Sequence, residues 1–350
     1  MAVVGFLGIL IVLTMGHELG HFFAAKKFGI TVKELGLGYP PRLWSIKRGE
    51  TVYSINVVPL GGFTKLLGEE DASQPGSLAS KGIAARIVVL SAGSIVNALL
   101  PILLLSISFM IPHDLIIEKV LVREVMPNSP AALTGIQPGD QVLEVNWATV
   151  HNMGDLKRFI YSSLGREMDI RVMHPNHTME NFQLIPRWKA PGDQTATGLL
   201  AVATNSQIVQ RRYPFWFAVP LAVYETVDIF IIFKNALVSM LLGVIPVVVT
   251  GPVGLAQITG EIAKGGIHPL LQFAALFNAN VALLNLFPLP ALDGGRIAFV
   301  VLEWIRRGKR ISAHAEGMIH AIGFALLLAF AVLLTYQDIL HIIHGDTLLK

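Results

Sequence analysis

Four apolar stretches along the chain have the length that a membrane-spanning helix requires. About 20 mainly apolar residues in a helix cross the hydrocarbon core of a bilayer. The stretches that meet this requirement are residues 2–23, 87–111, 269–292 and 318–336. They predict four transmembrane helices. The first stretch differs from a cleaved leader, because the basic pair Lys26-Lys27 follows it instead of preceding it.

A fifth apolar stretch, residues 215–242, carries Glu225, Asp228 and Lys234. Cytoplasmic loops are rich in Lys and Arg, and four spans with the N-terminus outside place both basic loops of this chain in the cytoplasm. A fifth span would move the basic cluster 306–310 outside. We therefore interpret 215–242 as a helix at the outer interface, packed on the bundle. The basic loop residues are Lys26, Lys27, Lys33, Arg42, Lys47, Arg48, Lys65, Lys81 and Arg86, then Arg296, Arg306, Arg307, Lys309 and Arg310.

Residues 115–187 alternate between apolar and polar positions in the way that strands do. Turn-forming residues such as those at 126–130 separate the alternating segments, and short helices are expected at 131–135 and 153–164. This pattern predicts a small β-rich domain outside the membrane. A second strand-like segment, residues 50–66, is expected on the cytoplasmic side.

The composition supports a membrane protein and limits its chemistry. Charged residues make up 15% of the 350 residues, against roughly 25% in a typical soluble domain, and the mean hydropathy is +0.59. The net charge of +3 is too small and too dispersed to suggest nucleic-acid binding. Because cysteine is absent, disulfides, Fe–S clusters and thiolate metal sites are excluded. Any metal must be held by His, Asp, Glu or carbonyl oxygen.

A metal-binding motif lies inside the first apolar stretch, which contains the run His17-Glu18-Leu19-Gly20-His21. The spacing places both histidines on one face of a helix, one turn apart, so the two imidazoles could share one Zn²⁺. Glu18 could then act on a water as the general base of an H-E-x-x-H arrangement. Polar residues are costly in an apolar span and mark a functional site by default. The alternatives are a chance match, or histidines that hydrogen-bond between helices.

A catalytic zinc usually has three protein ligands and one water, so a third His, Asp or Glu is needed. Asp293 is the acid closest to an apolar stretch whose inner end lies at the same depth as the two histidines. Pro288 and Pro290 must interrupt the helix before it, and irregular backbone at membrane depth is tolerated only inside protein or beside a watery cavity. The alternative role for Asp293 is a helix cap. His314 and His320, at the start of the fourth stretch, could face solvent or pack against protein.

These motifs resemble those of the site-2 protease family of intramembrane zinc metalloproteases, most closely the bacterial regulator-of-sigma type with a single PDZ domain. The resemblance covers nearly the whole chain. The run His17 to His21 matches the first family motif, and Asn285 to Gly295 matches the second, Asn-x-x-Pro…Leu-Asp-Gly. The remaining similar segments are 126–131 and 135–140 (PDZ domain), 59–65 (membrane-associated β-hairpin) and 251–254 (the segment before the third span).

The resemblance implies a reaction and a role for each residue at the metal. His17, His21 and Asp293 would ligate Zn²⁺, while Glu18 would take a proton from water and later give it to the leaving amine. The expected reaction is hydrolysis of peptide bonds in or near the transmembrane segments of single-pass membrane proteins, as in regulated intramembrane proteolysis. The expected substrates are anti-sigma factors already trimmed outside, or signal-peptide remnants. Membrane lipid is expected around the protein, and no nucleic acid is expected to bind.

The resemblance also implies how a substrate would be held. Asn285 would bind the substrate backbone near the scissile bond, and Pro288 would shape the broken helix. The strand around 52–57 and the segment 61–65 would pair with a substrate unwound into an extended strand. The PDZ-like domain would exclude intact substrates or bind new peptide carboxyl termini. The residues expected in the strand pairing are Tyr53, Ile55, Gly61, Gly62 and Phe63.

The expected fold is a polytopic α-helical protein of the bacterial cytoplasmic (inner) membrane. It has four transmembrane helices, a membrane-associated β-hairpin region and one extracytoplasmic PDZ-like β-rich domain, with the N-terminus also outside. The expected parts are residues 1–28 (first transmembrane helix with the zinc motif), 29–82 (cytoplasmic-side loop and β region), 83–112 (second transmembrane helix), 113–190 (PDZ-like domain), 191–268 (linker and interfacial helix), 269–295 (third transmembrane helix with the Asn/Pro/Asp motif) and 296–350 (cytoplasmic loop, fourth transmembrane helix and C-terminal tail).

Two other functions fit parts of the sequence. A non-catalytic membrane scaffold with a PDZ module would need none of the four metal-site residues. A metal or ion transporter would place polar residues along several helices and often shows an internal repeat. In this chain the polar groups cluster near one end of the spans and no repeat is found. The intact set of metal-site residues therefore favours the protease.

Overall fold

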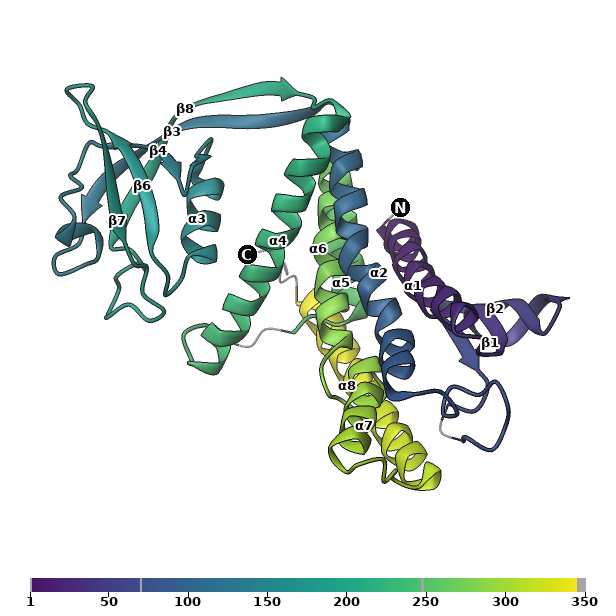
Figure 1. Cartoon of the computed structure of the whole chain (residues 1–350). Coiled ribbons are helices and arrows are strands. Elements are labelled where there is room, and N and C mark those ends of the chain that lie inside the picture. Colours follow the sequence, from purple (N-terminus) through teal and green to yellow (C-terminus); the bar gives the residue numbers. More distant parts are fainter. Residues whose placement is uncertain (1, 70, 247–248, 345–350) are drawn as a thin grey trace. The chain divides into compact units, whose positions relative to one another are not determined.

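The computed structural model describes residues 2–69, 71–246 and 249–344. The chain forms two compact units, one made of residues 1–108 and 249–350 and the other of residues 109–248 (Figure 1). The first unit holds most of the long helices and a β-hairpin, and the second holds a β-sheet and one long helix. The expected C-terminal tail lies outside the described residues from 345 onward.

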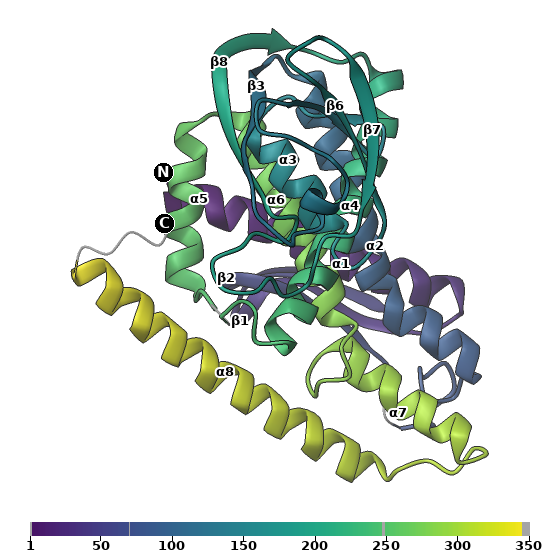
Figure 2. The same cartoon turned by 90° about the vertical axis from the view of Figure 1, so that its left-hand side faces the viewer.

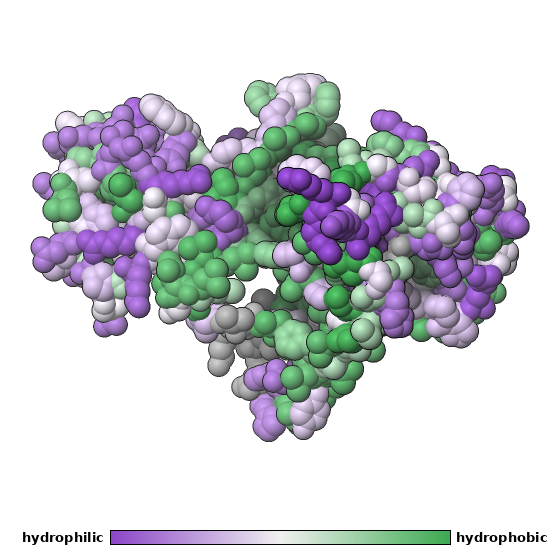
Figure 3. All heavy atoms as spheres, turned by 60° about the horizontal axis from the view of Figure 1, so that its bottom comes forward, coloured by the Kyte–Doolittle hydropathy of each residue, from purple (hydrophilic) through white to green (hydrophobic). Residues whose placement is uncertain are grey.

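Six helices of the described residues belong wholly or mainly to the first unit. Four of them coincide with the four predicted spans, and all four are long and apolar enough to cross a membrane. A fifth helix that meets this criterion, α4 (Phe215–Leu241), belongs to the second unit. Apolar residues cover much of the helical surface visible in Figure 3, so a multi-pass membrane protein is confirmed. The six helices are α1 (Ala2–Lys27), α2 (Ile83–Met110), α5 (Pro252–Lys264), α6 (Ile267–Asn285), α7 (Asp293–Ile305) and α8 (Ala313–Ile343).

The third predicted span is shorter than its apolar stretch. Helix α6 ends at Asn285, because Pro288 and Pro290 cannot donate backbone hydrogen bonds to a continuing helix. A second helix, α7, then begins at Asp293. An acidic residue is favoured in the first turn of a helix because the orphan N–H groups there carry partial positive charge. The segment after residue 295, expected as a cytoplasmic loop, therefore begins as a helix, since α7 extends to Ile305.

Helices α1 and α2 cross closely at glycines. A Cβ atom on Gly20 would lie 2.6 Å from the carbonyl oxygen of Ala92, and one on Gly93 would overlap the imidazole of His21. Small residues at such positions let two backbones approach within a bilayer. The crossing therefore brings the metal motif of α1 against the backbone of α2.

Helix α8 is one uninterrupted helix of 31 residues (Figure 2). Near its end, Asp338 is almost completely buried and accepts hydrogen bonds from the backbone N–H groups of Gly251 and Gly254 at 3.2 and 2.7 Å. These groups lie at the start of α5, where helix N–H groups have no intrahelical partner. The segment 251–254 is thus the capped start of a short helix.

A β-hairpin packs against α1 and is formed by β1 (Val32–Arg48) and β2 (Thr51–Leu66). The predicted strand at 50–66 is confirmed as β2, whereas β1 was not predicted. Residues 34–37 of β1 pair both with 52–55 and with 62–65. The 52–55 segment also pairs with 44–47, so it is paired on both sides, whereas 62–65 is paired on one side among the described residues.

The second unit contains a sheet of six strands with the order β7-β6-β4-β3-β8, in which β5 pairs with β4. The predicted β-rich domain is thereby confirmed, as are its two short helices. Strand β8 lies beyond residue 190, so the sheet continues past the expected domain boundary. The elements are β3 (His113–Val125), η1 (Ala131–Leu133), β4 (Gln141–Val145), β5 (Ala148–Thr149), α3 (Met153–Ser162), β6 (Met168–Met173), β7 (Met179–Leu184) and β8 (Leu199–Arg211).

A buried carboxylate ties two turns of this domain together. Asp140 is fully buried, accepts a hydrogen bond from the backbone N–H of Gln137 at 2.8 Å and lies 2.6 Å from His174 Nδ1. The hydrogen bonds of His174 with Asp140 and Glu180 raise the pKa of its imidazole above the ordinary value. The buried carboxylate of Asp140 therefore has two hydrogen-bond partners, the N–H of Gln137 and the imidazole of His174.

Helix α4 places its polar side chains against α3. Glu225 and Asp228 both pair with Arg158 of α3, the latter at 3.5 Å. Asn235, which is fully buried, donates hydrogen bonds to the carbonyl oxygens of Tyr161 and Ser162 at 2.7 and 3.1 Å. The last carbonyls of a helix lack intrahelical donors, so Asn235 satisfies the C-terminal end of α3.

Candidate metal centre and active site

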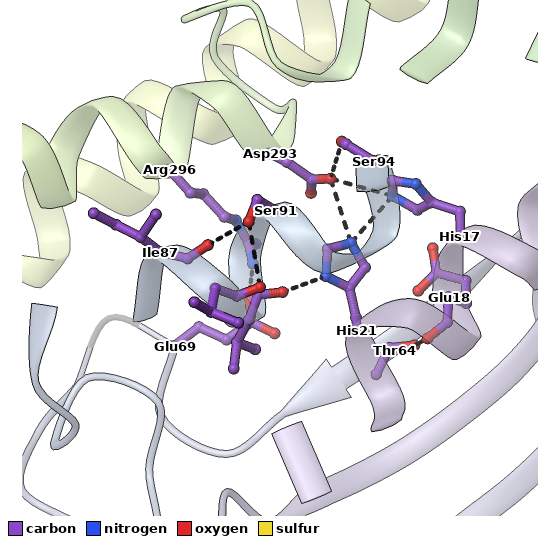
Figure 4. Close-up of polar contacts among 12 residues, drawn as sticks. His17, Glu18, His21, Thr64, Glu69, Ile87, Ser91, Ser94, Asp293 and Arg296 are labelled. Atoms are coloured by element: carbon purple, nitrogen blue, oxygen red, sulfur yellow. Dashed lines mark hydrogen bonds and ion pairs between the residues drawn. The ribbon is translucent and has the colours of Figure 1, made fainter. Parts of the chain in front are cut away.

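Three potential metal donors converge at the crossing of α1, α2 and α7 (Figure 4). His17 Nε2 and His21 Nε2 lie 3.1 Å apart, and each lies 3.3 Å from Asp293 Oδ2. The two histidines are one turn apart on α1, and Asp293 opens α7. The structure therefore brings together the three residues that the sequence suggested as ligands.

The spacing of these donors fits a tetrahedral zinc site. Zn–N and Zn–O bonds of about 2.1 Å at tetrahedral angles separate neighbouring ligand atoms by about 3.4 Å. The observed separations of 3.1 to 3.3 Å are close to this value. A catalytic zinc site can have two imidazoles and one carboxylate as its protein ligands, with the fourth position left for water.

Helix α2 orients two of the donors. His21 Nδ1 lies 2.8 Å from the carbonyl oxygen of Val89, which can only accept, so Nδ1 carries the hydrogen and Nε2 is free to bind a metal. Ser94 Oγ donates to Asp293 Oδ2 at 3.2 Å. Sequence reasoning missed both partners. The position of Ser94, a polar residue in an apolar span, could have indicated a role at the site. The carbonyl of Val89 could not, because every residue has a backbone carbonyl.

Glu18 lies beside the donors and against the β-hairpin (Figure 4). A Cβ atom on Gly62 would lie 3.2 Å from Glu18 Cγ, and Thr64 Oγ1 donates to the backbone carbonyl of Glu18 at 3.0 Å. The hairpin therefore holds this turn of α1 directly. Its glycine leaves room for the carboxylate side chain at the metal site.

A cavity of about 770 Å³ contains the three donors and Glu18. The β2 segment at 62–66 lines it, as do two ion pairs, Arg42 with Glu34 at 2.6 Å and Arg296 with Glu69. A cavity of this size holds an extended peptide of a few residues. The lining residues are His17, Glu18, His21, Glu34, Tyr39, Pro40, Arg42, Asn56, Gly62, Phe63, Thr64, Lys65, Leu66, Glu69, Leu90, Ala291, Asp293 and Arg296.

Several residues expected at the substrate site do not line this cavity. Asn285 ends α6, and Pro288 is exposed in the loop that follows. Tyr53 packs against the ring of Phe22, and Ile55 is 44% exposed. Gly61 borders Tyr39 with φ +122°. Of the five hairpin residues expected to bind substrate, Gly62 and Phe63 line the cavity.

Known proteins and a family profile match nearly the whole chain. A sequence profile of peptidase family M50 matches residues 5–330. A Clostridium perfringens protein with the provisional name of a zinc metalloprotease is 32% identical over 94% of this chain and 95% of its own length. A Nostoc protein with a similar provisional name is 30% identical over 97% of this chain and 96% of its own. The zinc metalloprotease RasP of Geobacillus kaustophilus is 25% identical over 97% of each chain.

The profile match covers residues 5–330, which belong to both units. The resemblance to the site-2 protease family is therefore confirmed, and zinc is the cofactor that the donor set fits. The chain belongs to peptidase family M50, the site-2 protease family, and is a zinc metalloprotease.

Proposed function

We propose that this metalloprotease hydrolyses peptide bonds within or next to the transmembrane segments of single-pass membrane proteins. The position of the metal site carries the proposal, because two of its three donors lie in α1, a helix apolar and long enough to cross a bilayer. His21 precedes the helix end at Lys27 by six residues, roughly 9 Å at 1.5 Å per residue. Bonds at membrane depth are the ones that such a site can reach.

The proposed mechanism divides the roles among four residues. His17, His21 and Asp293 hold the metal. When bound, Zn²⁺ lowers the pKa of a water molecule to about 7 and polarises the scissile carbonyl. Glu18 removes a proton from the attacking water and gives it to the leaving amine. The cavity that Glu18 shares with the three donors lets one carboxylate serve both proton transfers.

A substrate would bind by adding a strand to the hairpin. A peptide bond in a helix is shielded, so the substrate must first unwind, and an exposed sheet edge can then bind it through main-chain hydrogen bonds. Within the described part of the chain, segment 62–65 has a strand partner on one side only and lines the cavity, whereas 52–55 is paired on both sides. We therefore assign the pairing to Gly62 and Phe63, with Gly61 at the bend, in place of Tyr53 and Ile55. Asn285 and Pro288 keep their proposed roles in substrate binding and loop shape.

The proposed substrates are single-pass proteins in the bacterial cytoplasmic membrane, such as anti-sigma factors already trimmed outside, or signal-peptide remnants. The β-rich domain of the second unit has the strand and helix content expected for a PDZ module. In this proposal it excludes intact substrates or binds their new carboxyl termini, which makes cleavage the second step of regulated intramembrane proteolysis.

Cleavage at membrane depth can be tested with two single-span substrates in lipid nanodiscs. One substrate has a uniform leucine-rich span, and the other has two Leu→Gly substitutions at its centre. Each glycine lowers the cost of unwinding by about 1 kcal/mol, so the second substrate should be cut up to about 30-fold faster. Mass spectrometry should place the cut inside the span. Equal rates, cuts confined to water-exposed segments, or efficient digestion of casein would contradict the proposal.

We propose that four helices, α1, α2, α6 and α8, cross the membrane and that α4 does not. The contacts of α4 support this topology, because its buried Asp228 and Asn235 pair with α3 of the β-rich domain. A polar helix face that packs on a water-soluble domain belongs outside the hydrocarbon core. The N-terminus and the β-rich domain are then extracytoplasmic.

The natural absence of cysteine gives this topology a direct test. Lys189→Cys and Lys309→Cys each introduce one exposed thiol. In intact spheroplasts, a membrane-impermeant maleimide should label the variant at position 189, whereas the variant at position 309 should react only after permeabilisation. Labelling of position 309 in intact spheroplasts would show an even number of crossings between the two sites, where the four-span topology has one, and would overturn that topology.

A further inference from the structure

The loop that carries Asp293 into the metal site has a backbone that requires support. Pro288 and Pro290 remove two donors from the seven residues between α6 and α7. Ala291 has φ +73°, a left-handed conformation that non-glycine residues adopt at a cost of order 1 kcal/mol. Such a conformation persists only when its surroundings hold it in place.

The support comes from His320 on α8. Its Nδ1 accepts a hydrogen bond from the backbone N–H of Ala291 at 3.0 Å. The imidazole is 8% exposed and packs edge-on against Phe299 of α7, with ring centroids 5.5 Å apart. His320 therefore contacts both the loop and the helix that Asp293 begins. No sequence pattern distinguishes this histidine from His314.

Helix α8 offers the loop a second fitted contact three residues later. A Cβ atom on Gly323 would overlap Pro290, so the missing side chain is the space that the proline occupies. Residues three apart lie on one face of a helix. One face of α8 thus contacts two neighbouring loop residues: His320 accepts the hydrogen bond from Ala291, and Gly323 leaves space for Pro290.

We propose that His320 is a positioning residue for the metal ligand Asp293. It holds the turn at Ala291 so that Asp293 Oδ2 stays at 3.3 Å from both histidine donors. This proposal rests on the ligand roles proposed above. Two ligands come from a single helix and are spaced by it, whereas the third depends on this loop. Groups that orient metal ligands typically account for 10–100-fold in metal affinity.

The test uses the full-length protein in nanodiscs and measures Zn²⁺ affinity by competition with a chromophoric chelator. His320→Leu should weaken zinc binding by about 10–100-fold and lower kcat while leaving KM nearly unchanged. His320→Asn places its amide oxygen where Nδ1 lies and should restore affinity to within about threefold of the unmutated protein, whereas His320→Gln places its oxygen one atom too far. His314→Leu, at an exposed position on the same helix, should change nothing.

Each result has a defined meaning. Unchanged zinc affinity in folded His320→Leu would overturn the proposal. Where His320→Leu fails to fold, the Asn and Gln variants decide, and equal affinity for both would overturn it. Gly323→Ala, which pushes on Pro290 without changing His320, should weaken zinc binding as well. A weakened affinity in a protein that cuts no membrane substrate would refute the proposed function and leave the positioning role in place.

Discussion

Glu18→Gln is expected to lower peptide hydrolysis by about 10²–10⁴-fold, the range typical of a lost general acid–base group. Glutamine has nearly the same shape but cannot take a proton from water. The three metal donors are unchanged, so zinc content should stay at about one per chain. Cleavage of a single-span substrate, together with metal analysis of the same purified sample, measures both quantities.

A matched variant shows whether the effect belongs to the active site. Glu261→Gln changes an exposed carboxylate that pairs with Lys264, and it should leave cleavage within about twofold, as expected for a surface pair of small energetic weight. Full cleavage activity in Glu18→Gln would remove Glu18 from the mechanism. Loss of zinc from Glu18→Gln would instead make it a structural residue of the metal site.

Asp293→Ala is expected to strip the protein of stable zinc. Two imidazoles alone leave the metal without the third protein ligand that catalytic zinc sites use. The loss in affinity should exceed the 10–100-fold that removal of an orienting group produces. Chelator competition on purified protein gives the affinity, and cleavage should fall with occupancy.

Ser94→Ala provides the graded comparison. It removes the hydrogen bond to Asp293 Oδ2 but keeps the carboxylate, so its zinc affinity should lie between those of Asp293→Ala and the unmutated protein. Full zinc occupancy in Asp293→Ala would exclude Asp293 as a ligand. In that case His17 and His21 would require another partner among the cavity residues.

The metal site could be predicted from the sequence because each of its residues is conspicuous by itself. His17 and His21 stand out in an apolar span, and helical periodicity puts them on one face. Asp293 stands out because two prolines break the helix before it. The prediction needed only local geometry and the cost of polar groups in a membrane.

Strands β1 and β8 and the contact of His320 could not be predicted in the same way as the spans and the β-rich domain, because they lack a clear local pattern or depend on partners that are distant in the chain. Strand β1 holds Gly36, Gly38, Pro40 and Pro41, which disguise the alternation that marks strands. Strand β8 pairs with β3 across about eighty residues, and nothing local distinguishes it from a linker. A lone histidine in the last helix, such as His320, acquires meaning only when the loop at Ala291 is placed beside it.

The glycine crossing of α1 and α2 also limits the route by which a substrate arrives. A transmembrane helix with its side chains is about 10 Å across, and it cannot pass between two helices whose backbones touch at Gly20 and Ala92. The contact between α1 and α2 therefore blocks access to the metal site from that side. On the hairpin side, β2 lines the cavity beside Glu18. Under the proposed function, we therefore expect a substrate from the lipid to arrive along the hairpin, so that the strand proposed to pair with it is also the first part of the site that it meets.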